Sequence, residues 1–133
     1  VVITNNAIKK DFRNMMKRAG AMLSKGRLLG VQFSELFTNG LYLEISSHAM
    51  ECAQEIHAIF DDAGFEFLYN SPTNQLFPII EDSLQEKLSE EFSFEFWKRV
   101  DEKRSAVRFC SSWATKKENI DKLRSAVEKY TQK

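Results

Sequence analysis

The apolar residues of this chain change their spacing at Gly64, and this change constrains the fold more than any other feature of the sequence. Before Gly64 they recur every three to four positions, as on one face of a helix. The members of this stripe are Ile45, Ala49, Cys52, Ala53, Ile56, Ile59, Phe60 and Ala63. After Gly64, Phe65, Phe67 and Tyr69 occupy every second position, which is the spacing of a half-buried strand. The chain therefore combines a long helix, which Gly64 ends, with a sheet.

The residues after Gly64 predict a strand–strand–helix–strand–strand–helix order. Strands are expected over 65–69, 75–80, 92–97 and 105–111. Pro78 indicates a sheet edge or a bulge, because proline has no N–H to donate to a ladder. Ser83–Glu86 and Thr115–Glu118 each match a capping box, which predicts that a helix begins at each. Most of the eleven phenylalanines fall on inward positions, so we assign them to the core.

The residues before the stripe predict further helices. Apolar residues at helical spacing favour a helix over 7–18, and a second helix is expected from Arg27 to a left-handed stop at Gly40. Val1–Thr4 is strand-like. We weigh two interpretations of it equally: the last strand of a sheet whose other members are missing, or a short strand at a processed terminus.

Taken together, these elements predict an α+β fold. A small, mainly antiparallel sheet of about four strands would be covered by helices and preceded by long helices. We expect residues 1–40 to be a linking segment and residues 41–133 to form the α+β domain.

The composition argues against several classes of function. Lysine plus arginine and aspartate plus glutamate each number 19, so the net charge is zero. A general binder of nucleic acids or anionic membranes would show a basic excess. Cys52 and Cys110 lie far apart, which suggests a reduced, cytoplasmic compartment. His48 and His57 lack ligand spacing, so no metal site is expected. No apolar run approaches the ~20 residues of a membrane span, and no signal-peptide pattern is present.

Arg108 is the candidate binding residue. Alternation in the strand over 105–111 places Val107 and Phe109 on one face and Arg108 on the other, beside Ala106 and Cys110. These small neighbours leave the guanidinium room to bind a carboxylate or phosphate with a two-pronged contact. The more common role of such an arginine is a solvated or ion-paired surface residue.

A second, weaker signal is the loop around Lys25-Gly26-Arg27, which leads into a helix. Backbone amides and two cations could meet a phosphate there. The sequence contains no GxSxG elbow, no Walker-type loop and no HExxH motif, and it shows no obvious nucleophile or general base. From the residues alone, this is an α+β domain that binds an anion through Arg108.

Three blocks of sequence occur in an order that resembles the carboxy-terminal part of the threonine aldolase and β-eliminating lyase family. They are Gly26–Phe33, Ser71–Phe77 and Val107–Thr115. The family's members are pyridoxal-phosphate enzymes of the aspartate-aminotransferase fold, fold type I. The resemblance implies that a large domain, with the lysine that binds the cofactor covalently, precedes residue 1. It also implies that this chain is the small domain that closes the site.

The resemblance further implies roles for individual residues. Arg108 matches the arginine that binds the substrate α-carboxylate. In the family this contact determines which bond at Cα lies perpendicular to the cofactor ring. Lys25 and Arg27 match a segment near the cofactor phosphate and the dimer interface. No catalytic group is expected in this chain, so it would be inactive alone and bind no cofactor.

The parent protein is therefore expected to be a cytoplasmic, homo-oligomeric lyase that cleaves β-hydroxy amino acids such as threonine to glycine and an aldehyde. Two alternatives stay open. One is the small domain of a related aminotransferase or aromatic amino-acid β-eliminating lyase. The other is a free-standing, non-catalytic anion-binding α+β domain. Neither the preferred amino acid nor its stereochemistry follows from the sequence.

Overall fold

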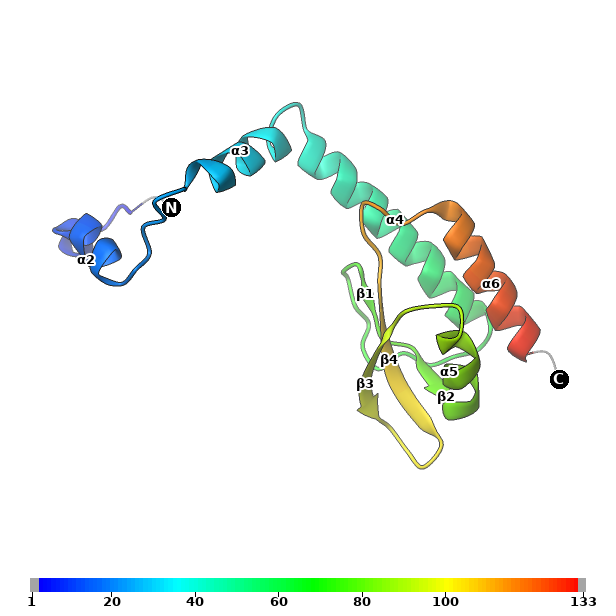
Figure 1. Ribbon diagram of the computed structural model, residues 1–133. Helices are drawn as coiled ribbons and strands as arrows, with labels where there is room; N and C mark the ends of the chain where they lie inside the picture. The colour runs from blue at the N-terminus through cyan, green and yellow to red at the C-terminus, as the bar shows by residue number, and fades with distance from the viewer. Residues whose placement is uncertain (1–2, 132–133) are drawn as a thin grey trace. The chain divides into compact units, whose positions relative to one another are not determined.

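A computed structural model describes residues 3–131 of the chain. Two compact units follow one another along it, Val1–Leu41 and Tyr42–Lys133. The first contains three short helices, which are coloured from blue to cyan in Figure 1: α1 (Asn6–Lys9), α2 (Phe12–Arg18) and α3 (Arg27–Leu36). The long α4 (Leu41–Asp62) follows. No helix among residues 3–131 combines the length and the apolar character needed to cross a membrane.

The single helix predicted over 7–18 is wrong, because the chain breaks between α1 and α2. Lys10 is extended and Asp11 adopts a left-handed conformation with φ of 60°. The Asp11 carboxylate accepts a hydrogen bond from the side-chain amide of Asn14. Aspartate tolerates this conformation when such a local bond stabilises it. The predicted strand at Val1–Thr4 falls partly outside the described residues, and Ile3 and Thr4 form neither helix nor strand.

Two left-handed glycines delimit α4. Gly40 has φ of 75° and precedes its first residue, so the left-handed conformation predicted for it is confirmed. The helix that Gly40 was expected to end stops earlier, because α3 ends at Leu36. Gly64 has φ of 81° after its end, where its N–H donates to the Asp61 carbonyl over 2.9 Å and the Phe65 N–H donates to the Phe60 carbonyl over 2.9 Å. This pair of bonds is the Schellman motif, which favours glycine at this position. Helices precede the sheet as predicted, but among residues 3–131 their lengths differ: α1, α2 and α3 have 4, 7 and 10 residues, and α4 has 22.

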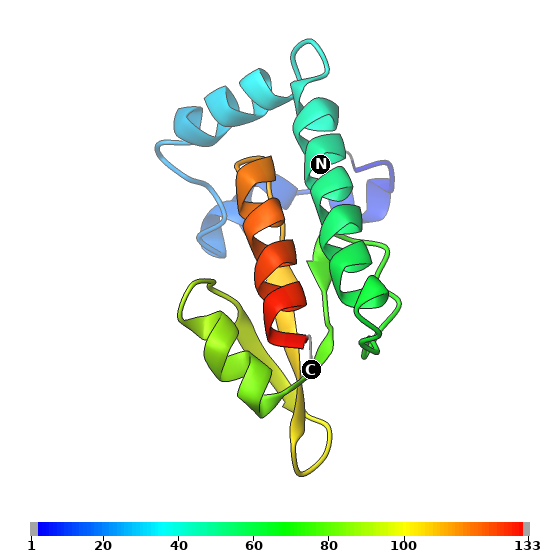
Figure 2. The same ribbon diagram turned by 90° about the vertical axis from the view of Figure 1, so that its right-hand side faces the viewer.

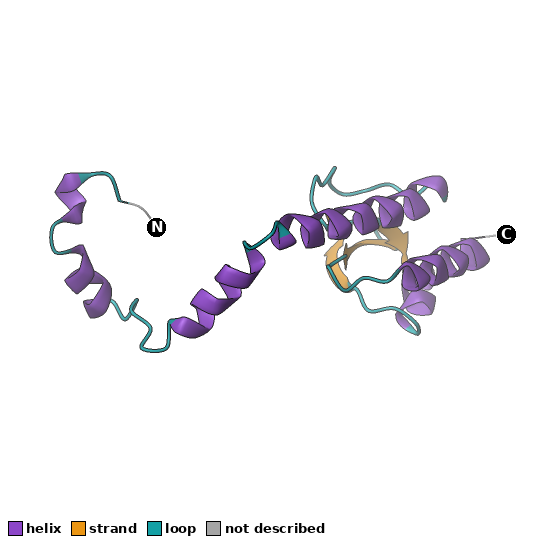
Figure 3. Ribbon diagram, turned by 90° about the horizontal axis from the view of Figure 1, so that it is seen from above, coloured by secondary structure: helices purple, strands orange, loops and turns teal. Residues whose placement is uncertain are grey.

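The second unit continues with an antiparallel sheet and two helices. Its remaining elements are β1 (Gln75–Leu76), β2 (Ile79–Glu81), α5 (Asp82–Ser89), β3 (Glu95–Arg99), β4 (Arg104–Cys110) and α6 (Lys117–Thr131). The central strand is β4, with β1 and β2 paired along one edge and β3 along the other. α4 and α6 lie side by side against this sheet in two perpendicular views (Figures 2 and 3). The predicted α+β fold with a small antiparallel sheet is confirmed.

Two of the predicted strands are shorter than expected. The strand predicted over 65–69 is reduced to a single bridge between Phe67 and Pro78. The strand predicted over 75–80 is interrupted at Pro78 into β1 and β2, which keep one register along β4. The Pro78 carbonyl still accepts from the Val107 N–H over 3.0 Å. The reciprocal bond cannot form because proline has no N–H, and the ladder therefore breaks at this point.

Both predicted capping boxes are wrong. α5 begins at Asp82, one residue before Ser83, and its N-cap residue is Glu81. α6 begins at Lys117, and the Thr115 hydroxyl accepts a hydrogen bond from the Ser112 N–H over 2.8 Å instead of capping the helix. In each case the preceding strand or turn fixes the entry of the chain into the helix, and this overrides the local sequence signal.

The core lies between the sheet and the helices α4, α5 and α6. Its largest fully buried members are Phe60, Ile80, Leu88, Val107 and Val127. Phe60 and Phe109 lie 5.2 Å apart between ring centroids and join α4 to the central strand. Phe65, Phe67, Phe92 and Phe94 also pack against this core, so the assignment of most phenylalanines to it holds. The exceptions include Phe33, Phe37 and Phe96, which are more than half exposed. Phe96 lies on the outer strand β3, just before the break in register that falls between it and Lys98.

We expect Leu88→Ala to lower the free energy of unfolding by about 2–5 kcal/mol, because it leaves a cavity where α5 meets the core. Leu88 is fully buried, whereas Leu43 is 72% exposed. Leu43→Ala makes the same chemical change on a helix and should alter the free energy by less than about 0.5 kcal/mol. Urea unfolding followed by circular dichroism measures both. Equal losses for the two variants would contradict the placement of the core.

Candidate functional site

The alternation of β4 places Arg108 on the sheet face opposite the core. Val107 and Phe109, its neighbours in the chain, are 0% and 6% exposed and belong to the core cluster. Successive side chains of a strand point to opposite faces, so Arg108 projects away from α4 and α6. Its side chain is 26% exposed and is therefore largely buried, although it does not lie in the helix-covered core.

Three side chains surround the guanidinium. Nη2 donates to Oε2 of Glu95, with which it forms an ion pair, and Nη1 donates to Oε1 of Gln75 over 3.3 Å. The Trp97 ring centroid lies 5.4 Å from the guanidinium carbon, close enough for a cation–π contact. Nε is buried and has no hydrogen-bond partner among the described residues. The guanidinium is thus held in place while part of its donor capacity is unused.

Aromatic rings extend from Arg108 across this face of the sheet. The rings of Trp97 and Phe77 lie 5.0 Å apart between centroids, and those of Phe77 and Tyr69 lie 5.3 Å apart in an edge-to-face arrangement. Phe77 is buried, whereas Trp97 and Tyr69 are about half exposed. The apolar surroundings lower the local dielectric constant, which strengthens the attraction of the guanidinium for an anion.

The sequence indicates Arg108 as the candidate binding residue but does not point to its neighbours Gln75, Glu95 and Trp97. Glu95 is the register partner of Arg108 across the β3–β4 hairpin, and Gln75 pairs with Cys110 on the other edge of β4. Neighbours across strands interact through their side chains. A correct alignment of the three strands would have found them, but the register depends on the bulge in β3 and is not visible in the sequence.

The chain that follows Arg108 is a well-bonded turn. The Ser111 hydroxyl is buried and donates to the Ala49 carbonyl of α4 over 2.7 Å. The Asn74 side-chain amide donates to the Ser111 carbonyl over 2.7 Å, and the Ser111 N–H donates to the Asn74 carbonyl over 3.1 Å. These bonds fix the end of β4 to α4 and to the turn before β1. They therefore restrain the strand that carries Arg108.

A cysteine–histidine pair lies beside this turn, and its geometry argues against a nucleophile. Cys52 Sγ lies 3.6 Å from His48 Nε2, which in turn lies 2.9 Å from the Thr115 carbonyl oxygen. A carbonyl only accepts, so Nε2 carries the proton of that bond and is not available as a base for the thiol. Burial raises the pKa of the Cys52 thiol, and the nearby charges of Glu55 and Glu51 raise it further. The thiol is therefore protonated and unreactive near neutral pH.

Lys25 and Arg27, the sequence candidates for a cofactor phosphate, belong to the first unit. Lys25 lies in the turn before α3, and Arg27 is the first residue of α3. Both side chains are exposed, and neither forms an ion pair or hydrogen bond among residues 3–131. The two cations and the α3 amides fit a phosphate in charge.

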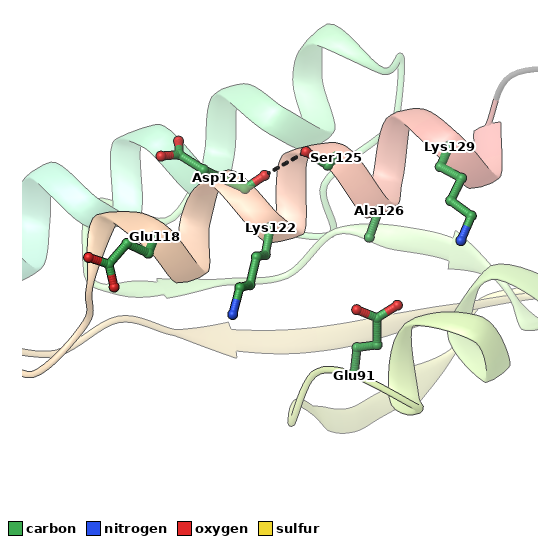
Figure 4. A pocket seen from close by; sticks show the side chains of 7 residues that line it. All are labelled: Glu91, Glu118, Asp121, Lys122, Ser125, Ala126 and Lys129. Carbon is green, nitrogen blue, oxygen red and sulfur yellow. Dashed lines mark hydrogen bonds between the residues drawn. The ribbon is translucent and has the colours of Figure 1, made fainter.

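A groove between α6 and the end of α5 carries no recognisable site (Figure 4). It is lined by Glu91, Glu118, Asp121, Lys122, Ser125, Ala126 and Lys129. The charged side chains point along its walls without converging, and the Ser125 hydroxyl is used by the Asp121 carbonyl over 3.0 Å. No group of three or more metal-binding side chains within residues 3–131 could hold an ion. Charges of both signs on an open groove are typical of a solvated surface.

The fold and the Arg108 site define an α+β domain that presents a partly buried arginine, flanked by aromatic rings, on one face of an antiparallel sheet. The chain is similar to the carboxy-terminal part of threonine aldolases. It is 26% identical over 124 residues to a low specificity L-threonine aldolase from a Pseudomonas species, covering 92% of this chain and 35% of the relative. No protein-family model matches the chain.

A solved structure gives the same result. Threonine aldolase from Leishmania major superposes with a TM-score of 0.91 and 29% identity, covering 98% of this chain and 38% of the solved one. The resemblance predicted from the three sequence blocks is confirmed by both comparisons. The chain thus spans 35% and 38% of the lengths of these two relatives.

We expect Cys52 to react with a thiol reagent at pH 8 at least about tenfold more slowly than Cys110, because the thiolate is the reacting species and a raised pKa lowers its fraction. Cys110 is exposed, whereas Cys52 is buried. Rates of reaction with a chromogenic disulfide in Cys110→Ser and Cys52→Ser variants measure each thiol separately. In urea the two rates should converge. A native Cys52 as fast as Cys110 would contradict the argument against a nucleophile.

Proposed function

We propose that this chain is the substrate-carboxylate-binding domain of a pyridoxal-phosphate-dependent lyase that cleaves β-hydroxy amino acids such as threonine. The observation that carries the proposal is the position of Arg108: a largely buried guanidinium on the uncovered sheet face, stacked by Trp97 and with a donor unused. The similarity to two threonine aldolases supports it. Arginine is suited to this role because its planar fork matches a carboxylate.

In this proposal each part of the site has a defined task. Bound pyridoxal phosphate would supply the electron sink for cleavage of the Cα–Cβ bond. Arg108 would hold the α-carboxylate and so fix the orientation of the amino acid about Cα. Trp97 and Phe77 would keep water away from the contact, which strengthens it. The bonded turn after β4 would keep the guanidinium in position as the domain closes over its substrate.

Lys25 and Arg27 are proposed to contact the phosphate of the cofactor, on the basis of their charge and their place at the start of α3. We propose that no lysine of this chain forms the covalent bond to the cofactor. Every lysine within residues 3–131 is exposed. None of them therefore lies in a site that this chain by itself closes to water, as a lysine bonded to pyridoxal phosphate would.

Apolar side chains on the first unit and at the start of α4 support a larger assembly. Leu28, Phe33, Phe37 and Leu43 are each more than 60% exposed. A monomer rarely exposes this many large apolar groups in one stretch of chain. We propose that another domain or a second copy of the protein covers them, as in a cytoplasmic homo-oligomer.

The alternatives use the same arginine. An aminotransferase or a β-eliminating lyase would also bind its substrate carboxylate at Arg108, so the site alone does not separate them. The similarity to two threonine aldolases favours the aldolase. A non-catalytic carboxylate-binding domain would share the site but have no use for the Lys25 and Arg27 cations.

We expect Arg108→Lys to weaken binding of L-threonine by about 1.5–3 kcal/mol, a factor of roughly 10 to 150, because the two-pronged contact is lost. Nuclear magnetic resonance titration of the chain with L-threonine measures the affinity. L-Threoninol, which lacks the carboxylate, is the matched control ligand and should not perturb Arg108. Equal binding of the two ligands would overturn the proposed role.

We also expect that no single lysine of the chain alone forms a stable covalent complex with pyridoxal phosphate, because all of its described lysines are exposed. Absorbance spectra recorded after the chain is mixed with the cofactor and then dialysed test this expectation. A protein-bound band that survives dialysis and disappears on substitution of one lysine would contradict it.

A further inference from the structure

We propose that Glu95 is a displaceable internal ligand of Arg108. In the free site its carboxylate is hydrogen-bonded to the guanidinium. When an amino acid binds, the carboxylate of that ligand displaces Glu95 from the guanidinium. The inference rests on the function proposed above. It adds a residue that competes with the substrate and so sets its affinity.

Glu95 occupies only part of the hydrogen-bonding edge of Arg108. Glu95 lies directly across the hairpin from Arg108, and one of its oxygens, Oε2, accepts from Nη2. Nε projects from the same edge of the guanidinium plane as Nη2, and it is the buried atom without a partner. Glu95 therefore satisfies one of the two donors on this edge and leaves the other unpaired.

A ligand carboxylate would complete this edge. Its two oxygens would accept from Nε and Nη2 together, which is the two-pronged arrangement that carboxylates and arginine prefer. A buried donor without a partner is unfavourable, so a ligand that pairs it has an advantage over Glu95. The amide oxygen of Gln75 would stay on Nη1 and keep the plane of the guanidinium fixed.

The Glu95 carboxylate can separate from Arg108 and be solvated. Its side chain is 66% exposed on the edge strand β3, so its carboxylate can turn into water without burying a charge. The neighbouring pair of Arg99 and Asp82 differs. Both Asp82 oxygens accept from Arg99, over 2.8 and 2.7 Å, and one also accepts from the Ser105 hydroxyl over 3.4 Å. Both oxygens of Asp82 are thus engaged, whereas Glu95 makes its contact through a single oxygen.

The test compares affinities for L-threonine, read from the Nε–Hε resonance of Arg108 in the ¹⁵N-labelled chain at constant ionic strength. Arg108→Lys assigns the resonance. Glu95→Gln removes the competing charge and should tighten binding by about two- to fivefold, the range expected of an exposed ion pair. Glu102→Gln makes the same change in the turn between β3 and β4, away from Arg108, and should leave the affinity unchanged.

A second variant changes the affinity in the opposite direction. Gln75→Glu places another internal carboxylate against Nη1 and should weaken binding by about two- to fivefold. Gln75→Glu also tests the competition if Glu95→Gln does not fold. A purely structural role of these contacts predicts altered stability without weaker binding of L-threonine. An unchanged or tighter affinity in Gln75→Glu would then overturn the inference.

The outcomes separate this inference from the function on which it rests. If threonine perturbs Arg108 equally in the unaltered chain and in Glu95→Gln, the competition is overturned and the carboxylate site stands. If threonine perturbs Arg108 in neither, both are overturned. A gain in Glu95→Gln with no gain in Glu102→Gln supports the inference.

Discussion

The packing of β4 against the helices is the interaction on which the rest of this structure depends. Val107 and Phe109 enter the core beside Phe60 of α4, and this burial fixes which face of the strand is inward. A shift of one residue would bury Arg108 and expose both apolar side chains, at a cost of several kcal/mol. The same contacts that stabilise the domain therefore orient its candidate binding residue.

The site on the opposite face depends on charge held in apolar surroundings. Trp97 lies beside the guanidinium of Arg108 and packs against Phe77, and Glu95 and Gln75 hold the guanidinium through hydrogen bonds. Burying an unpaired guanidinium would be costly, so an internal carboxylate stabilises the site when no ligand is present. In the proposed function, stability in the free state and affinity for a ligand therefore compete at the Glu95 side chain.

The comparisons and the geometry support different parts of the functional argument. Similarity to two threonine aldolases connects the chain to the carboxy-terminal part of these enzymes, and it accounts for the whole of the described fold. It does not identify the residue that contacts a substrate. The position of Arg108 suggests that residue, because the core packing holds this largely buried cation on the outer face of the central strand.

The sequence by itself determined the stripe of α4, the left-handed glycines at both of its ends and the two faces of β4, because these depend on local geometry and on simple periodicity. The tertiary structure alone decided the strand register, the break at Pro78 and the start of α5, because each depends on hydrogen bonds to residues distant in the chain. The register in turn placed Glu95, Gln75 and Trp97 around Arg108. Contacts between strands are formed by packing and not by neighbours in sequence, so the cation could be predicted but its surroundings could not.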